Sequence, residues 1–173
     1  MKSVLISIQP KWCELIASGK KTVEVRKTKP KLDVPFKCYI YCTMPKNKHD
    51  NLVLTPFGYD VGSEAAYCNY AGNSNGKVIG EFVCDKIITA EEGCYVNIPR
   101  VESQIDALDL MDYADGKTVY GWHISDLVIY DKPRELREFV FTSTVHTNCF
   151  GKHTKQVKRP PQSWCYVESE DTE

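Results

Sequence analysis

The stretch GKKTVEVR, residues 19–26, decides the fold of this chain. Its second half alternates strictly between polar and apolar residues, and this period of two predicts a strand with one buried face. Val23 and Val25 are expected to face the core. Glu24 and Arg26 would then project together from the opposite face of the same strand.

The polar face of this strand suits recognition of a planar polar ligand. Glu24 and Arg26 would lie about 7 Å apart along the strand, with Lys21 at its mouth. A guanidinium group can hold a phosphate or a base edge through two hydrogen bonds, and a carboxylate can accept from an exocyclic amino group. The alternative interpretation is a solvated strand face that carries an ordinary Glu–Arg pair.

On both sides of residues 19–26, the sequence predicts several strands and few helices. Pro10 suits a first helical turn, and Trp12, Leu15 and Ile16 form one apolar helix face that Gly19 ends. Strands are expected at 3–8, 22–26, 35–43, 77–89, 120–124, 127–130 and 163–168, helices at 10–18 and 101–113, and a short helix or turn at 131–139.

Two irregular polar segments interrupt this pattern. Residues 44–76, rich in Gly, Asn, Pro and Tyr, are interpreted as a loop insertion that covers a site, and residues 140–160 as a second insertion. Gly80 is expected to mark a bulge or a close approach of two strands. Residues 169–173 form an acidic tail, which leaves 1–168 as one predicted domain.

The net charge of −1 would by itself argue against a nucleic-acid-binding protein. The charges are segregated, however, because residues 1–50 carry 11 Lys or Arg against four Asp or Glu, and residues 81–138 carry six against 13. The basic cluster surrounds residues 19–26, so it would either attract phosphate or form a solvated basic face. Its members are Lys20, Lys21, Arg26, Lys27, Lys29 and Lys31.

The remaining composition is that of a globular chain. No apolar run is long enough to cross a membrane, and the N-terminus lacks a signal-peptide pattern, so we expect a cytoplasmic protein. Eight cysteines without a CxxC pair are interpreted as reduced, mostly buried thiols. His146, Cys149 and His153 are the alternative, a three-ligand metal site. We expect no metal, no cofactor and no obligate protein partner.

The segment GKKTVEVR after a short helix resembles the GxKxxExR signature of the ASCH domain, a branch of the PUA-like superfamily. SIQPKWCELIASGKKTVEVRK resembles the opening strand, helix and second strand of that family, and GKVIGEFVCDKI its central strand. YGWHISDLVIYDKP and RPPQSWCYVE resemble the closing strands of a prokaryotic and phage subgroup. The resemblance implies an α+β fold: a small mixed β-barrel of PUA type with helices at its ends.

The resemblance also implies a cleft that binds RNA or a modified nucleotide. The residues carried over to it are Gly19, Lys21, Glu24 and Arg26, and Lys20 is added from the basic cluster. Some family members hydrolyse N4-acetylcytidine with a Lys, a Thr and a Glu, and others are ribonucleases. Lys21 matches that Lys and could act as base or nucleophile. Glu24 stands where the Thr would be, as a second catalytic candidate.

Several further residues are candidates for the same site. Glu102 is one candidate for the downstream Glu of the hydrolases. Trp122, Ser163 and Trp164 are further candidates for nucleotide binding, because aromatic faces stack bases. Alternation favours the core for Trp122 and leaves Trp164 open between core and cleft. The helical face predicts a core position for Trp12, and a structural role is favoured for His123.

A protein-interaction module built on the acidic helix 101–113 is the third alternative. The sequence contains no motif for it. The leading prediction is therefore a nucleotide-binding cleft, with a small hydrolase as the runner-up.

Overall fold

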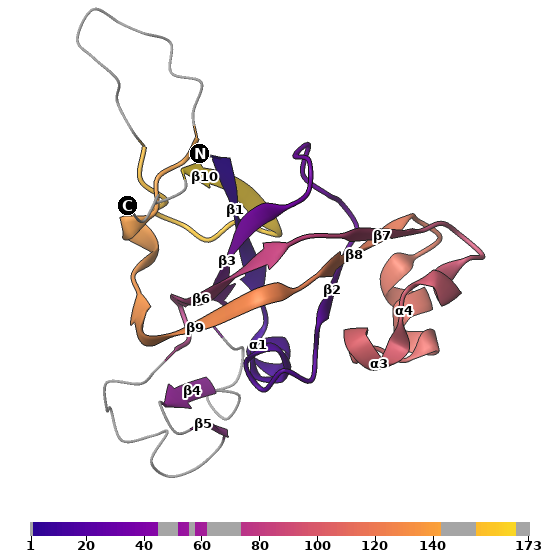
Figure 1. The fold of residues 1–173 in the computed structure, drawn as a ribbon, viewed down its shortest axis with the longest axis horizontal. Coiled ribbons are helices and arrows are strands. Elements are labelled where there is room, and N and C mark those ends of the chain that lie inside the picture. The colour runs from indigo at the N-terminus through magenta and orange to yellow at the C-terminus, as the bar shows by residue number, and fades with distance from the viewer. Residues whose placement is uncertain (1, 45–51, 56–57, 62–73, 143–154, 169–173) are drawn as a thin grey trace, which may run out of the picture.

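The computed structural model describes residues 2–44, 52–55, 58–61, 74–142 and 155–168. Within these residues the chain has an α+β fold with a five-stranded and a three-stranded sheet and few helices (Figure 1). None of the described helices combines the length and the apolar character that crossing a bilayer requires. The α+β class agrees with the sequence prediction.

The five-stranded sheet has the order β10-β1-β3-β6-β9. Its central pair, β1 and β3, is parallel, and every other neighbour is antiparallel. The parallel pair follows from the crossover through the first helix and β2, which the sequence predicted between them. The strands are β1 (Lys2–Ile8), β3 (Phe36–Cys42), β6 (Lys77–Cys84), β9 (Ser125–Arg134) and β10 (Trp164–Glu168).

The three-stranded sheet has the order β2-β8-β7, with β2 (Val23–Arg26), β8 (Val119–His123) and β7 (Ile87–Ala90). Trp122 of β8 is fully buried and packs edge-on against Phe36 of β3, with 5.8 Å between the two ring centres. This contact joins the two sheets through one apolar core. The hydrogen bonds of the described strands do not close the two sheets into a single barrel.

Helix α1 (Pro10–Ala17) connects β1 to β2 and begins at a proline, as predicted. Cys13 and Ile16 of this helix are buried against the core. Gly19 follows the end of the helix with φ of 72°, a left-handed conformation that favours glycine. The predicted end of the helix is therefore confirmed, and the chain turns there directly into β2.

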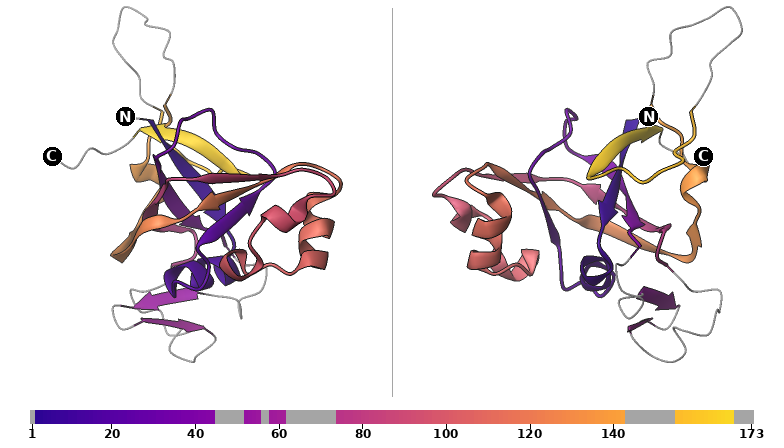
Figure 2. Two further views of the ribbon diagram at one scale, coloured as in Figure 1. Left: turned by 45° about the vertical axis from the view of Figure 1, so that its right-hand side comes forward. Right: turned by 180° about the vertical axis from the view of Figure 1, so that it is seen from behind.

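The predicted helix at 101–113 is wrong in its extent. The chain forms two short helices, α3 (Arg100–Ser103) and α4 (Ala107–Ala114), because Gln104 takes a left-handed conformation and the Asp106 carboxylate caps the start of α4. Val101 of α3 and Leu108 of α4 are each 75% exposed. Figure 2 shows α3 and α4 beyond the three-stranded sheet, far from β10.

The predicted strand at 77–89 is also wrong in its extent, because it is two strands in two different sheets. β6 ends at Cys84 and β7 begins at Ile87, and the exposed pair Asp85-Lys86 turns the chain between them. Gly80 confirms the expected close approach. A Cβ at this position would collide with the Val128 carbonyl oxygen, and the β6–β9 register shifts beside it.

The two predicted insertions contain regular structure. Residues 44–76 include the hairpin of β4 (Leu52–Thr55) and β5 (Gly58–Val61), and β4 lies beside α1 (Figure 1). Within the second predicted insertion, Gln156 forms an isolated β-bridge with Val140, and Val157 is buried. The segment 131–139 begins as the end of β9 and continues as a 3-10 helix, η3 (Leu136–Glu138). Another 3-10 helix, η2 (Tyr95–Asn97), lies between β7 and α3.

Candidate functional site

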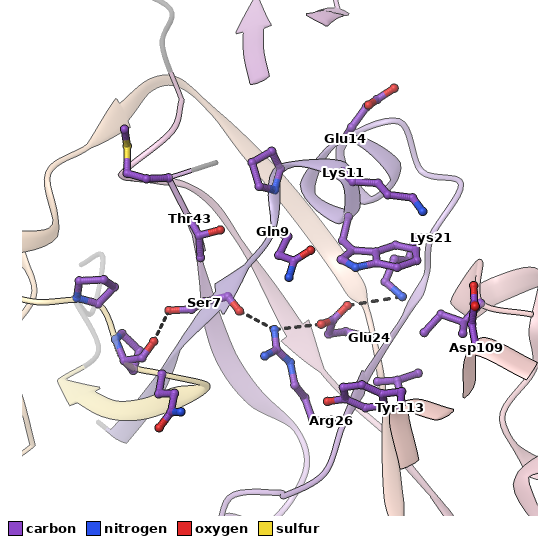
Figure 3. Close-up of a pocket in the computed structure, with 18 of the residues that line it drawn as sticks. Ser7, Gln9, Lys11, Glu14, Lys21, Glu24, Arg26, Thr43, Asp109 and Tyr113 are labelled. Carbon is purple, nitrogen blue, oxygen red and sulfur yellow. Dashed lines mark hydrogen bonds and ion pairs between the residues drawn. The ribbon is translucent and has the colours of Figure 1, made fainter. Parts of the chain in front are cut away.

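A cleft of about 1130 Å³ opens between α1 and α4, with the polar face of β2 as its floor (Figure 3). The end of β1, residues 43–44 after β3, Ile105 before α4 and the segment 160–162 before β10 also line it. The volume is slightly above the range of about 300–1,000 Å³ that is typical of small-molecule sites. The cleft thus lies on the strand that the sequence singled out.

Three charged side chains on the floor form what we call the cleft network. The Glu24 carboxylate accepts from Arg26 Nη2 at 2.9 Å and lies 3.4 Å from Lys21 Nζ. The side chains of Lys21, Glu24 and Arg26 are only 1%, 7% and 12% exposed. Two cations therefore share one carboxylate in a nearly dry environment, where electrostatic interactions are strong.

Arg26 connects the network to the neighbouring elements. Its Nη2 also donates to the Ser7 carbonyl at 2.6 Å, and the Ser7 hydroxyl donates to the Pro161 carbonyl at 2.7 Å. Its Nε is buried and has no hydrogen-bond partner among the described residues. A buried donor without a partner is costly, so a ligand acceptor placed there would gain a charge-assisted hydrogen bond.

Lys21 is held by three groups of the protein. Its Nζ donates to the Ser103 carbonyl at 2.6 Å, approaches Glu24, and lies 4.9 Å from the centre of the Trp12 ring. Burial lowers the pKa of Lys21 below its ordinary value, although the Glu24 carboxylate opposes this effect; nearby Arg26 lowers the pKa further. The amine is thus prepared to lose its proton more readily than an exposed lysine.

Two aromatic side chains form walls above the network. Trp12 on α1 is half-buried: it packs against the core, as predicted, and it also lines the cleft. Tyr113 on α4 is 40% exposed, and partial burial raises the pKa of its phenol. Figure 3 shows Tyr113 beside Arg26. The ring centre of Trp12 lies 4.9 Å from Lys21 Nζ.

The sequence did not single out Tyr113, Ser7 or Gln9 as site residues, although all three line the cleft. The helical pattern placed Tyr113 at the end of an acidic helix. No local signal in the sequence indicated that α4 packs over β2. Ser7 lies in an apolar run, and what it contributes to the floor is chiefly its backbone carbonyl.

The remaining predicted site residues lie at different distances from the cleft. Gly19 shapes the turn into β2 without lining the cleft, and Lys20 is exposed beside it. Trp122 is in the core, as alternation favoured, and the structure does not bring it to the cleft. Glu102 is exposed, and only its backbone carbonyl, which accepts from the Thr22 amide at 2.8 Å, contacts the β2 region.

Ser163 and Trp164 lie at the start of β10. The Ser163 carbonyl accepts from the Ser7 amide at 2.9 Å, and Trp164 Nε1 donates to the Thr28 hydroxyl at 3.0 Å. Neither residue lines the cleft. His123 Nδ1 pairs with the Asp85 carboxylate at 2.6 Å, away from the cleft lining.

The metal-site alternative at His146, Cys149 and His153 lies outside the described residues. Among the residues that are described, no group of three or more His, Cys, Asp or Glu is placed to hold a metal ion.

Comparison with known proteins supplies a family match and structural neighbours. Residues 6–111, more than half of the chain, match the family model of the ASCH domain. An ASCH protein from Zymomonas mobilis is 20% identical, with a TM-score of 0.61 over 98% of this chain and 90% of that one. A mutant of it with phenylalanine for tyrosine gives 19% identity, 97% and 91% coverage and a TM-score of 0.61.

A second mutant of the same Zymomonas mobilis protein, with alanine for serine, is 17% identical and gives a TM-score of 0.55 over 96% of this chain and 88% of that one. No curated protein matches the chain. At these identities the solved structures establish the fold alone.

Proposed function

The chain belongs to the ASCH domain family, and on this premise we propose that its cleft binds an unpaired nucleotide of RNA or a free modified nucleotide. The observation that carries the proposal is the cleft network, two buried cations around one buried carboxylate on the cleft floor. A buried charged cluster in a cleft is a frequent feature of ligand sites.

The residues of the network take complementary roles. Arg26 supplies the guanidinium group for a phosphate or a base edge, and its buried Nε is still without a partner among the described residues. Glu24 accepts from an exocyclic amino group, as carboxylates accept from cytosine N4. Trp12 and Tyr113 offer two aromatic surfaces for stacking the base, each such contact being worth about 1–3 kcal/mol.

We test this proposal by isothermal titration calorimetry with cytidine 5′-monophosphate. Arg26→Met removes the guanidinium group and keeps an apolar stem, and we expect affinity to fall at least about tenfold, since a charge-assisted hydrogen bond is worth about 1.5–3 kcal/mol. The matched control is Lys37→Met, which removes a cation from β3 outside the cleft. Equal affinities for the wild type and Arg26→Met would refute the proposal.

A second candidate function, hydrolysis of N4-acetylcytidine-type nucleosides or of RNA, is favoured by one observation. Burial lowers the pKa of Lys21 next to the Glu24 carboxylate, and a deprotonated lysine is a base or nucleophile. A substrate would first have to compete with the Ser103 carbonyl for the amine. Turnover by the wild type that is lost in Lys21→Met and kept in Lys37→Met would support it, whereas turnover that survives in Lys21→Met would exclude Lys21.

For the architecture, we treat 1–168 as one ASCH domain with insertions at 44–76 and 140–160 and an acidic tail at 169–173. The two sheets around their shared core would be the halves of a small PUA-like barrel. Limited proteolysis tests this assignment, because cleavage should be confined to the insertions and the tail. Early cleavage between β6 and β9 would contradict it.

A further inference from the structure

The cleft has two edges of opposite charge. One edge is formed by the exposed pair Lys158-Arg159, which directly precedes the cleft-lining residues 160–162, and we call it the basic edge. The other is helix α4. Figure 3 shows the C-terminal segment and Asp109 of α4 on opposite sides of the cleft. A ligand that carries charge along its length therefore meets a different environment at each end.

The basic edge lies where the chain leads into β10. Lys158 and Arg159 are exposed and directly precede Pro160 and Pro161, which line the cleft. The basic segment 27–31 after β2 is not part of this edge, because Lys27 Nζ lies 5.2 Å from the centre of the Tyr113 ring of α4.

The acidic edge has the reverse composition. Asp109 and Asp112 of α4 line the cleft and are exposed, and Asp106 and Asp115 lie at the two ends of the same helix. Residues 101–116 contain no Lys or Arg. An RNA backbone passing over α4 would bring its phosphates beside these carboxylates, where like charges repel.

We propose that the cleft takes the terminal nucleotide of a single-stranded RNA, whose backbone leaves the protein over the basic edge. This inference rests on the proposed function and adds a direction to it. The terminal base lies above the cleft network, Lys158 and Arg159 contact the phosphates that follow, and α4 blocks continuation of the strand on the other side. A base inside a continuous strand binds more weakly, because its backbone would also pass beside the carboxylates of α4.

The first test compares a short linear oligocytidylate with a circular one of the same length, by fluorescence anisotropy at low salt. We expect the linear RNA to bind at least about tenfold more tightly, a difference of about 1.4 kcal/mol. Asp109→Lys combined with Asp112→Lys should raise the affinity for the circle towards that for the linear RNA. Asp126→Lys with Asp131→Lys, on the exposed side of β9, is the control with the same change of charge.

The second test measures how affinity depends on salt. Removing two phosphate contacts with Lys158→Ala and Arg159→Ala should reduce the slope of log affinity against log salt by about 1.4, since each single-strand phosphate contributes about 0.7. Binding of cytidine 5′-monophosphate should not change. Lys86→Ala with Lys132→Ala removes the same charge from exposed positions outside both edges.

Equal wild-type affinity for the circular and linear RNA would overturn the inference, as would an unchanged salt slope in the Lys158 and Arg159 double variant. Both results leave the proposed function intact as long as the mononucleotide binds and Arg26→Met weakens it. A mononucleotide that binds the wild type and Arg26→Met equally would refute the proposed function, and the inference with it.

Discussion

Two Lys–Glu networks of similar chemistry lie on different faces of this molecule. The cleft network joins Glu24 to Lys21 and Arg26. A second one, here called the sheet network, joins Glu81 of β6 to Lys37 at 2.9 Å and to the Tyr130 hydroxyl at 2.6 Å. In the cleft network the side chains are at most 12% exposed, whereas Lys37 and Glu81 are 29% and 24% exposed.

The difference in burial separates a ligand site from a structural ion pair. In the sheet network one cation and one phenol satisfy one carboxylate, and water screens the pair. In the cleft network two cations compete for one carboxylate under an aromatic wall, and Arg26 Nε has no partner among the described residues. Of the two networks, the cleft network contains a buried donor that no described residue satisfies.

The largest expected effect concerns stability. Glu24→Ala leaves two buried cations without their carboxylate, and breaking a buried ion pair costs about 3–5 kcal/mol of unfolding free energy. The matched Glu81→Ala should cost about 1 kcal/mol or less, because its pair is partly solvated. Urea unfolding at neutral pH measures both values. Equal losses in the two variants would show that the networks do not differ in kind.

An intermediate effect is expected on binding. Trp12→Ala removes the aromatic wall next to Lys21, and the affinity for cytidine 5′-monophosphate should fall about 10- to 100-fold, corresponding to about 1–3 kcal/mol of stacking. Tyr130→Phe is the counterpart in the sheet network and should leave affinity unchanged. Calorimetric titration of both variants measures the effect, and a Trp12→Ala variant that binds like the wild type would contradict a stacking role.

The smallest effects concern pH, and in both networks the wild type should gain stability relative to the variant as pH rises, but in two different pH ranges. Burial alone would raise the pKa of Glu81, but hydrogen bonds from Tyr130 and Lys37 lower it below its ordinary value of 4.5. A carboxylate with a lowered pKa stabilises the fold above the unfolded value and loses that contribution as pH falls. The wild type should therefore be more stable than Glu81→Gln at neutral pH. This difference in unfolding free energy should shrink as pH falls below 4.5, by about 1 kcal/mol at most.

Lys21 should show a dependence of the same sign in the alkaline range. Burial lowers its pKa in the folded chain, so the unfolded chain binds more protons between the folded pKa and the unfolded value of about 10.4. The wild type should accordingly gain stability relative to Lys21→Met as pH rises towards about 10.4. Urea unfolding at several alkaline pH values measures the difference, and a constant difference between the two proteins would show that Lys21 does not titrate differently on folding.

The sequence predicted the β2 part of the site and missed the part contributed from a distance. Strict alternation placed Glu24 and Arg26 on one face, and Gly19 ended α1, because both are local properties of the backbone. The position of Tyr113 depends on how α4 packs over β2, which a helical period does not encode. Trp12 was assigned only to the core, because periodicity identifies an apolar face without saying that the same side chain also lines a cleft.

The larger errors have the same origin. The run 77–89 reads as one strand because its apolar residues continue past Cys84, yet the exposed pair Asp85-Lys86 divides it between two sheets. The 101–113 pattern was disrupted by the left-handed Gln104 and the Asp106 cap. In both places a turn made by ordinary polar residues interrupted an apolar pattern, and only tertiary contacts reveal it.

The most direct test of the account uses the indole N–H signals of the three tryptophans in a two-dimensional NMR titration with cytidine 5′-monophosphate. Each signal is assigned by a single Trp→Phe variant. The account predicts a saturable shift of the Trp12 signal that is weakened in Arg26→Met, while the signal of fully buried Trp122 stays in place. Saturable binding that leaves the Trp12 signal unmoved would contradict a nucleotide site on the cleft network.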